Sequence, residues 1–572
     1  MIVFKNISVF NFRLAAFLSR FTEVKYFKFS LDRKKKNILI NINKNNIYQI
    51  DNTKKNKIND FSIYFNDQKN IIKNHLKIFT TRKIFLSISD LIKKKFSTNI
   101  ILKMFVYEKI AEAYISYYTP LKYWSLTFSK TKKIYYLSFD FVDIFLPKIE
   151  NVTKVIIPIN IIPLFKFIFR KLTFKKKIKK TNIDKNNYTY KVGFLVHKSI
   201  QYSNLYQKDY FYSKQKKSSF YKSNILHFFY SIQLLERNFN NFILLKSQNS
   251  LKQFFKYFIK NVIYIRSFMD IYVLFSYLKF IIDTEHYIKV LKKYKSLKLF
   301  IIDNENQAPK PFLLALKKLK IKIISTEERT LSKYNFPLSF MGDIYFGSSK
   351  YFYKKNFFKV NKIIPVGYPR TDQMIKYKSN GNFVLILGLL GDRNYCNHKN
   401  EIIINWEEQL YFINQIINLC NSNKRENFVL MYKNFDWIKN TYFKDIRKKI
   451  LKTKNLTINM EPFSTYKLAQ KSKLIISYYS TVVEEMIFAR KPVLVFDYSR
   501  NINYIFKKSI RNGTIPFIFC NNFNELQNKF QRVVYNKKFR INLLNNLRRF
   551  MKQPKTTFKT KEILLENLEN LL

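Results

Sequence analysis

Residues 474–497, LIISYYSTVVEEMIFARKPVLVFD, carry the clearest structural pattern in this chain. Two short apolar runs, Leu474–Ser477 and Val493–Phe496, have the length and composition of buried strands. The segment between them, Thr481–Ala489, has a helical pattern behind a Ser-Thr pair that can cap a helix. A strand, a helix and a second strand in this order form a parallel pair joined by a crossover helix. The stretch therefore predicts one unit of a doubly wound α/β sheet.

The same alternation continues on both sides of this stretch. We expect further strands at Phe383–Leu390, Phe428–Tyr432, Leu456–Met460 and Ile515–Phe519, helices at Glu401–Cys420 and Thr465–Lys471, and more helices up to the C-terminus. Alternating strands and helices are typical of a parallel sheet covered by crossover helices. Residues 371–572 are therefore predicted to form a Rossmann-like domain with C-terminal helices.

A second alternating run lies upstream, in residues 189–370. Its expected strands are Lys191–His197, Asn261–Arg266, Lys298–Asp303, Ile321–Ser325, Asp343–Gly347 and Lys362–Val366, with a helix at Pro311–Leu319. This run predicts a first Rossmann-like domain. Because open α/β sheets bind ligands beyond the carboxyl ends of their strands, we expect both domains to present strand-end loops to a cleft between them.

Residues 1–188 are less regular, with Lys- and Asn-rich stretches between short apolar runs. A helix is expected at Met104–Tyr118 and a strand at Lys133–Phe141. At 572 residues the chain exceeds what one hydrophobic core organises. The predicted fold class is α/β, with two Rossmann-like doubly wound domains facing a cleft and an N-terminal α/β accessory region of unassigned function.

The chain is strongly basic. Lys and Arg together number 104 against 38 Asp and Glu, which gives a formal net charge of +66. Lys far outnumbers Arg and accompanies abundant Asn, Ile, Phe and Tyr, a joint bias that we interpret as a low-GC coding background. Neither a groove-reading Arg cluster nor a zinc finger is present, so no nucleic-acid partner is expected. The charge still attracts anionic ligands and acidic lipid head groups.

The cysteines and the apolar segments indicate a cytoplasmic protein. Cys396, Cys420 and Cys520 lie far apart without a metal-ligand spacing, so we expect reduced thiols and no metal site. Val155–Phe169 is too short and too interrupted to span a bilayer of about 30 Å. Because the basic run 170–180 follows it, two interpretations stay open: a peripheral anchor on the inner face of the cell membrane, or a buried element followed by a solvated loop.

The loop at residues 479–481 is the best candidate for a phosphate site. Tyr479, Ser480 and Thr481 lie where a buried strand meets a helix start, and free backbone amides and the positive end of the helix dipole favour an anion there. Glu484 and Glu485 follow about one turn inside the helix, where one of them can reach ribose hydroxyls. The alternative is an ordinary capped βαβ unit in which the glutamates only complement the dipole.

At this point the chain resembles a known family. The 474–497 stretch looks like the donor-binding βαβ unit of GT-B glycosyltransferases, and residues 366–372, VGYPRTD, are similar to the Gly-x-Pro-Arg-x-Asp stretch of CDP-glycerol glycerophosphotransferases and related capsule- and surface-polysaccharide enzymes. Gly367 permits a tight turn, which aims Arg370 at a diphosphate while Asp372 caps the following helix or holds Arg370. The alternative is an interdomain hinge in which Arg370 and Asp372 pair with each other.

The catalytic base stays open at the sequence level. Family members commonly carry a His-Gly pair after the fourth strand of the first domain, where this chain has Ser325–Thr330, STEERT. Glu327 or Glu328 can act as the base, because a carboxylate in a closed cleft can have its pKa raised towards neutrality. His197, at the end of the first strand of this domain, is the other candidate because its intrinsic pKa suits the task.

Three further residues are expected near the donor. Gly388 and Arg393 belong to the end of the first strand of the second domain and the loop after it, and Lys433 ends the next strand. With cationic side chains and a helix end to neutralise the leaving diphosphate, neither a metal nor another cofactor is required.

The resemblance implies a transferase that moves a sugar or a polyol phosphate from a nucleotide-activated donor. Its acceptor would be a glycan or a lipid-linked molecule in bacterial surface-polysaccharide biosynthesis. Two alternatives stay open: a nucleotide-sugar epimerase of the same double-Rossmann shape, and a non-enzymatic basic nucleic-acid-binding protein.

Overall fold

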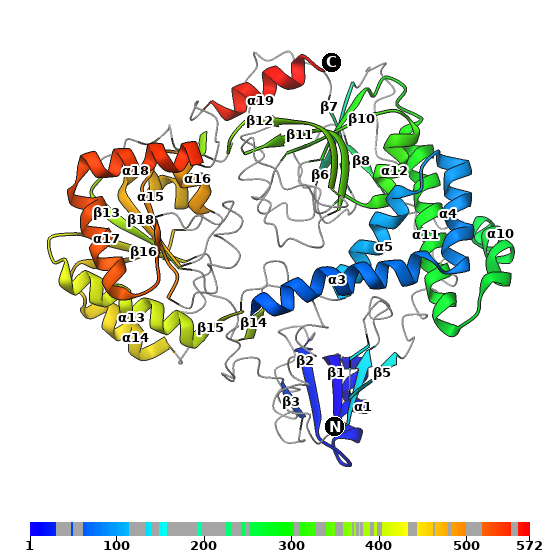
Figure 1. Cartoon of the computed structure of the whole chain (residues 1–572), viewed down its shortest axis with the longest axis horizontal. Coiled ribbons are helices and arrows are strands. Elements are labelled where there is room, and N and C mark those ends of the chain that lie inside the picture. Colours follow the sequence, from blue (N-terminus) through cyan, green and yellow to red (C-terminus); the bar gives the residue numbers. More distant parts are fainter. Residues whose placement is uncertain are drawn as a thin grey trace. The chain divides into compact units, whose positions relative to one another are not determined.

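The computed structural model of this chain (Figure 1) is described residue by residue over most of its regular elements. The described residues are 1–7, 9–29, 47–49, 61–113, 133–138, 148–149, 151–156, 191–196, 225–229, 242–245, 251–302, 308–326, 339–348, 358–368, 371–372, 374, 377, 381–388, 394–396, 403–432, 443–461, 464–478, 482–498, 517–550 and 559–572.

The chain forms two compact units that are interleaved along the sequence. The first contains residues 1–184, 247–289 and 310–318, and the second contains residues 185–246, 290–309 and 319–572. Each unit is described by itself below.

The first unit contains a parallel sheet that the sequence had indicated only as mixed α/β structure. Among the described residues its strands are β1 (Ile2–Ile7), β2 (Val24–Phe29), β3 (Ile47–Gln49), β4 (Ile134–Ser138) and β5 (Val152–Ile156), in the order β3-β2-β1-β4-β5. Helix α1 (Val9–Leu18) connects the first two. In chain order the strands run 3-2-1-4-5, which is doubly wound, so the N-terminal region holds a Rossmann-like sheet of its own. The expected strand at Lys133–Phe141 is confirmed as β4.

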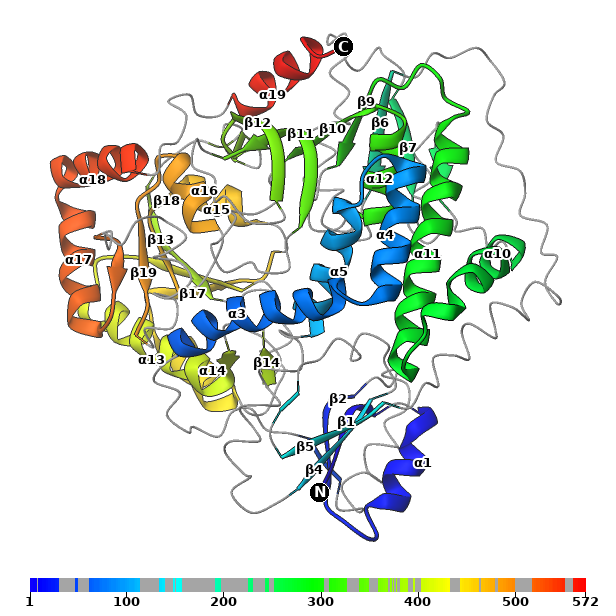
Figure 2. The same cartoon turned by 45° about the vertical axis from the view of Figure 1, so that its right-hand side comes forward.

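Helices from distant parts of the sequence pack together in this unit. They are α3 (Phe61–Thr80), α4 (Lys83–Phe96), α5 (Ile100–Ala113), α10 (Leu251–Asn261), α11 (Phe268–Leu291) and α12 (Lys310–Lys318). Figures 1 and 2 both show α4 and α5 beside α11, where Phe85 meets Tyr277 at a ring distance of 5.9 Å. Arg82 pairs with Asp270 at 2.6 Å. The expected helix at Met104–Tyr118 is present as α5, which begins four residues earlier.

The second unit contains the first of the two expected Rossmann-like sheets. In the part of the chain that the structure describes, its strands are β6 (Val192–Val196), β7 (Ile225–Phe229), β8 (Phe242–Leu244), β9 (Leu299–Ile302), β10 (Lys322–Thr326), β11 (Phe340–Gly347) and β12 (Phe358–Pro365). They are all parallel, in the order β12-β11-β10-β9-β6-β7-β8. In chain order this is 3-2-1-4-5-6-7, so the strand order reverses between β6 and β9.

The second expected sheet follows in the same unit. Its described strands are β13 (Phe383–Gly388), β16 (Phe428–Tyr432), β17 (Leu456–Asn459), β18 (Ser472–Ser477), β19 (Val493–Phe496) and β20 (Phe519–Cys520), parallel in the order β17-β16-β13-β18-β19-β20. In chain order this is 3-2-1-4-5-6, the Rossmann order, with its reversal between β13 and β18. The predicted fold class, α/β with two Rossmann-like doubly wound sheets, is confirmed by these two strand orders. The cleft expected between them stays a prediction.

Helices on this sheet complete its core. They are α13 (Trp406–Ser422), α14 (Lys444–Lys452), α15 (Thr465–Lys471), α16 (Val482–Phe488), α17 (Phe523–Tyr535) and α18 (Lys537–Phe550). Because parallel strands are buried on both faces, their sequences are nearly continuous apolar runs, and every residue of β19 is buried. Phe412 of α13 lies against Phe496 at a ring distance of 6.2 Å, and Phe530 of α17 stacks on Phe428 at 5.9 Å. A short antiparallel hairpin, β14 (Asn394–Cys396) with β15 (Ile403–Asn405), precedes α13.

The last helix returns to the first sheet of the second unit. Helix α19 (Thr560–Glu569) contributes Leu564, Leu565 and Leu568 to a core cluster that includes Val192 of β6 and Leu299 of β9. The C-terminal helices expected with the second Rossmann-like domain therefore divide: α17 and α18 cover the second sheet, and α19 packs on the first.

One expectation for the first sheet was wrong. The run Asn261–Arg266 is not a strand: Asn261 ends α10, and Val262–Tyr264 forms the short 3-10 helix η4. Its apolar residues suggested a buried strand, yet Val262 and Ile263 are 40% and 68% exposed. The sequence also missed β7 and β8, which extend the sheet beyond β6.

None of the described helices is long and apolar enough to cross a membrane. Of the apolar segment Val155–Phe169, the structure describes only the first two residues, which end β5. The basic run that follows lies outside the described residues, so both interpretations of it stay predictions.

Candidate functional site

The strands that the predicted donor residues end or follow share one edge of the second Rossmann-like sheet. Strands β13, β16 and β18 end at Gly388, Tyr432 and Ser477. Because the strands are parallel, these ends lie at the same edge, and β13 and β18 are the neighbours at which the strand order reverses. Ligands of doubly wound sheets bind at this place.

The structure describes some of the predicted donor residues and not others. Gly388 is the last residue of β13, two residues before the predicted end of that strand at Leu390. The other strand-end candidates, Arg393, Lys433, Tyr479, Ser480 and Thr481, lie outside the described residues. Lys433 comes directly after β16, and residues 479–481 fill the gap between Tyr478 and α16. Their roles stay predictions.

The residues just before this loop are buried, and sequence reasoning passed over them. Tyr478, which follows β18, is fully buried and stacks on Tyr498 at a ring distance of 5.1 Å and an angle of 17°. Tyr498 in turn contacts Tyr411 of α13 at 4.5 Å. The Oγ of Ser477 is buried without a hydrogen-bond partner among the described residues. This aromatic packing fixes the strand end from which the predicted phosphate loop departs.

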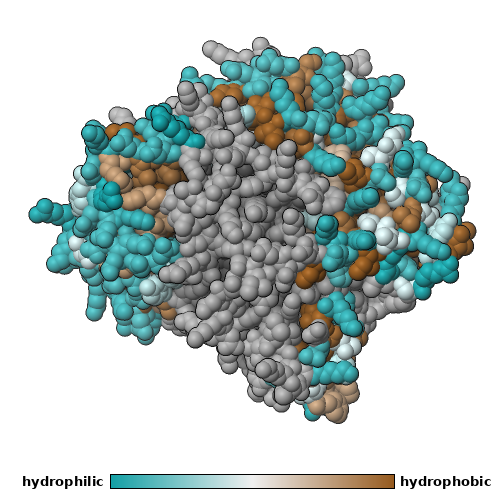
Figure 3. Space-filling view, viewed as in Figure 1, coloured by the Kyte–Doolittle hydropathy of each residue, from teal (hydrophilic) through white to brown (hydrophobic). Residues whose placement is uncertain are grey.

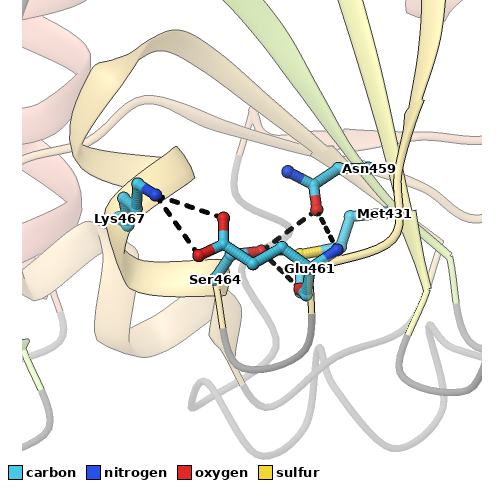
Figure 4. A network of polar contacts seen from close by, with 5 residues as sticks. All are labelled: Met431, Asn459, Glu461, Ser464 and Lys467. Atoms are coloured by element: carbon cyan, nitrogen blue, oxygen red, sulfur yellow. Dashed lines mark hydrogen bonds and ion pairs between the residues drawn. The ribbon is translucent and has the colours of Figure 1, made fainter.

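A polar network holds the neighbouring strand ends (Figure 4). The hydroxyl of Ser464, which is 3% exposed, donates to the backbone oxygen of Glu461 at 2.8 Å and lies 3.9 Å from Met431 Sδ. The backbone amide of Glu461 donates to Asn459 Oδ1 at 2.7 Å, and Lys467 Nζ pairs with the Glu461 carboxylate at 3.1 Å. These contacts join the ends of β16 and β17 to the start of α15. The network therefore holds the carboxyl end of β16 in place, and Lys433 follows this strand in the sequence.

The two glutamates of α16 are engaged with tyrosines. Glu484 is 1% exposed, and its carboxylate accepts a hydrogen bond from Tyr368 Oη at 2.8 Å. Glu485 is 4% exposed and accepts a hydrogen bond from Tyr466 of α15. Neither tyrosine was among the predicted site residues. The predicted contact of one glutamate with ribose stays untested, and the structure adds a role in holding α16 in place.

The segment 366–372 joins the two Rossmann-like sheets and contacts α16. Gly367 has a φ of +96°, the left-handed region that the predicted tight turn requires. A Cβ at this position would lie 2.3 Å from Cζ of Phe488, the last residue of α16. The Tyr368 ring meets the same phenylalanine edge-on at 5.7 Å. The junction therefore lies directly against the helix that follows the predicted phosphate loop.

Asp372 makes a contact that the sequence did not indicate. Its Oδ1 accepts a hydrogen bond from the backbone amide of Thr560 at 3.3 Å, at the first residue of α19. Asp372 thus caps a helix 188 residues away. Arg370 lies outside the described residues, so the predicted contact between Asp372 and Arg370 stays a prediction.

Lys491, just after α16, gives the region a pH dependence. Its Nζ donates to the backbone oxygen of Gln470 at 2.5 Å, and burial lowers its pKa from 10.5 to about 8. Between these two values the unfolded chain binds a proton that the folded chain has released, so stability rises with pH across this window.

We expect the free energy of unfolding of the wild type to rise relative to that of Lys491→Met as the pH goes from 8 to 10.5. The relative gain should be about 1 kcal/mol or more, after allowance for partial exposure. Urea unfolding at several pH values measures it. The exposed Lys454, replaced by Met, serves as the control and should show no such trend. A parallel pH dependence in the wild type and Lys491→Met would contradict the assignment.

The candidates for the catalytic base belong to the first sheet of this unit. His197 comes directly after β6, and Glu327 and Glu328 come directly after β10. All three lie outside the described residues. Because β9 lies between β6 and β10, the two strand ends are two strand spacings apart, roughly 10 Å. Both candidates therefore follow the carboxyl edge of the same sheet, and the choice between them stays open.

Comparison with known proteins adds structural matches only. No protein-family model and no curated protein matches the sequence. Among solved structures, UDP-GlcNAc 2-epimerase from Neisseria meningitidis bound to UDP-GlcNAc is 12% identical, with a TM-score of 0.40, and the match covers 66% of this chain and 99% of that one. Acinetobacter baumannii MurG is 12% identical, with a TM-score of 0.38 over 66% and 99% of the two chains. The wall teichoic acid polymerase TagF is 11% identical, with a TM-score of 0.37 over 72% and 96%. At these scores the fold assignment rests on the two strand orders.

Proposed function

We propose that this chain is a transferase of the GT-B type, which moves a sugar or a polyol phosphate from a nucleotide-activated donor to a glycan or lipid-linked acceptor. The observation that supports this most directly is that the strands preceding the motif-bearing loops end side by side at the carboxyl edge of a Rossmann-ordered sheet. The loop 479–481 follows β18, and Gly388 ends β13, the strand beside it across the order reversal.

We place the donor diphosphate at this edge. Backbone amides of the loop 479–481, the hydroxyls of Ser480 and Thr481, and the cations Arg393 and Lys433 would neutralise its charge, and Arg370 would do so from the junction. The tyrosine contacts of Glu484 and Glu485 support this placement because they fix the helix that begins directly after the loop. Charge neutralisation by protein groups requires no metal or further cofactor.

We place the acceptor at the first sheet of the same unit. A group there takes the proton from the acceptor hydroxyl as the new bond forms. In a sugar transfer the bond between the anomeric carbon and the diphosphate oxygen breaks, and the nucleoside diphosphate leaves with that electron pair. In a polyol-phosphate transfer the P–O bond within the diphosphate breaks, and the nucleoside monophosphate leaves with the pair. His197 and the pair Glu327 and Glu328 remain the candidates for this base. We place the reaction in the cytoplasm, as part of surface-polysaccharide biosynthesis. The buried free thiols of Cys420 and Cys520 agree with a reducing compartment.

A thermal-shift series with UDP-, CDP- and GDP-linked donors tests the proposal. A ligand that binds only the folded chain raises its melting temperature, so we expect one class of donor to stabilise the wild type. Ser480→Ala should weaken that donor's affinity by about tenfold, because a hydrogen bond to a charged group contributes about 1.5–3 kcal/mol. Ser472→Ala, at the opposite end of β18, is the matched control and should leave donor affinity unchanged.

Three outcomes would contradict the proposal. Stabilisation that survives Ser480→Ala would remove the assigned donor site. Conversion of the donor without any acceptor would favour an epimerase. Binding to random-sequence DNA that persists at physiological salt, with no stabilisation by any donor, would favour a nucleic-acid-binding protein.

A further inference from the structure

Helix α10 and the short η4 that continues it expose a row of large apolar side chains. Phe255, Ile259, Val262 and Ile263 are 51%, 67%, 40% and 68% exposed. Phe255, Ile259 and Ile263 are spaced four residues apart, so the first two lie on one face of α10 and the third continues that direction into η4. Single exposed apolar residues are ordinary, but a contiguous row marks an interaction surface. We call residues 255–266 on this outer face the α10 surface.

The outer row is not needed to hold α10 in the fold. The inner face does this: Phe254 and Phe258 stack on Phe275 of α11 at ring distances of 5.2 and 5.7 Å. Tyr257 Oη donates a hydrogen bond to the carboxylate of Glu285 in α11 at 2.6 Å, and Ser87 Oγ of α4 donates one to Asn261 Oδ1 at 2.8 Å. With the inner face packed in this way, the exposed row is left for a partner.

The α10 surface is positively charged as well as apolar. Lys256 and Lys260 are exposed and form a second row beside the first, one residue further along the helix, and the exposed Arg266 follows. The sequence has no acidic residue from 251 to 269, and the first one after it, Asp270, is paired with Arg82. Figure 3, drawn from the same side as Figure 1, shows brown apolar surface beside teal hydrophilic surface at the edge where Figure 1 labels α10.

We propose that the α10 surface docks on the surface of an anionic lipid bilayer, with α10 lying in the interface. An apolar row that enters the boundary between head groups and acyl chains, beside a basic row that meets lipid phosphates, is the arrangement that interfacial helices use. Lys and Arg side chains near an anionic leaflet are attracted to it, and the apolar side chains stabilise the bound state by leaving water. The site is distinct from the basic run 170–180, and it goes beyond the proposed transfer reaction.

Charge argues against a second copy of this chain as the occupant. In a two-fold dimer through this surface, Lys256 and Lys260 of one copy would face the same residues of the other. The whole chain carries a formal net charge of +66, so bulk repulsion opposes the same contact. An anionic leaflet instead supplies the opposite charge to both rows of side chains.

Vesicle co-sedimentation of the full chain tests this proposal. The probes are vesicles of phosphatidylcholine alone and of phosphatidylcholine mixed with phosphatidylglycerol, at low and at raised salt. Ile259→Ser/Ile263→Ser should lower the affinity for the mixed vesicles by about tenfold or more, since a combined loss of about 1.4 kcal/mol from the two contacts is already a factor of ten. The matched control, Leu451→Ser/Tyr535→Ser, removes side chains that are 75% and 59% exposed elsewhere and should change the affinity less than about twofold.

The measurements at raised salt distinguish docking through the α10 surface from the general attraction of a basic protein to anionic vesicles. Salt screens the bulk charge, so wild-type binding that persists there while Ile259→Ser/Ile263→Ser loses it supports the proposal. Equal binding of the two proteins at raised salt overturns it. A concentration-dependent dimer in sedimentation velocity that only the α10 variant loses also overturns it, in favour of a second copy. Donor stabilisation measured on the same samples reports separately on the proposed transferase.

Discussion

Replacing Gly367 with alanine is expected to destabilise the protein by about 3 kcal/mol or more. Two costs add at this position. An L-residue is strained at a φ of +96°, which costs about 1–3 kcal/mol, and the new Cβ would lie 2.3 Å from the ring of Phe488. That ring is fully buried against Tyr368, so relief by its movement costs a further 1–3 kcal/mol or so. Urea unfolding followed by circular dichroism measures the loss.

Gly381 provides the matched control for this prediction. It also has a positive φ, +62°, but a Cβ there meets only the Cβ of Lys473 at 3.8 Å, an ordinary contact. Gly381→Ala should therefore cost only about 1 kcal/mol, the backbone term alone. Phe488→Leu in the Gly367→Ala background should recover part of the loss. Equal destabilisation by the two alanines would show that the contact with Phe488 does not matter.

Parts of the fold could be predicted because their apolar pattern is dense and sharply bounded. Val493–Phe496 was predicted with its observed bounds, since Pro492 precedes it and Asp497 follows it. The run 261–266 has a similar composition but ends a helix, because the face that packs on α11 is set by residues earlier in α10. The N-terminal sheet was missed as a sheet because the polar residues Lys5 and Asn6 interrupt the apolar pattern of β1, IVFKNI.

The sequence was enough to predict which edge of the sheet holds the candidate site. It was not enough to predict the long-range hydrogen bonds that stabilise the elements around that edge. Strand ends follow from local sequence, and parallel pairing then brings them together. The hydrogen bond from Tyr368 to Glu484 joins residues 116 positions apart, and the cap from Asp372 to Thr560 spans 188. A glutamate one turn inside a helix looks the same in sequence whether it contacts a ribose or a buried tyrosine. The structure adds the contact with Tyr368, and the contact with ribose stays a prediction.

Glu484→Ala is expected to cost about 3 kcal/mol of stability, and Tyr368→Phe about 1–2 kcal/mol. The first change leaves the buried Tyr368 hydroxyl without this acceptor and opens a cavity, and the second removes only the donor of the hydrogen bond. A double-mutant cycle with both changes should show coupling, since the two groups touch. If the two losses of unfolding free energy are strictly additive, the interaction between Tyr368 and Glu484 contributes nothing to stability.

The same two variants separate a structural role of Glu484 from a direct contact with the donor, provided that the proposed donor site is correct. Tyr368→Phe changes no atom of the glutamate, so it affects donor affinity only by loosening α16 and the loop before it. We expect both variants to weaken donor binding by a similar factor, because the carboxylate is 1% exposed and already accepts the tyrosine hydroxyl. Thermal-shift titration of each variant with the stabilising donor measures this. A loss of affinity in Glu484→Ala with wild-type affinity in Tyr368→Phe would instead assign the carboxylate to the ribose.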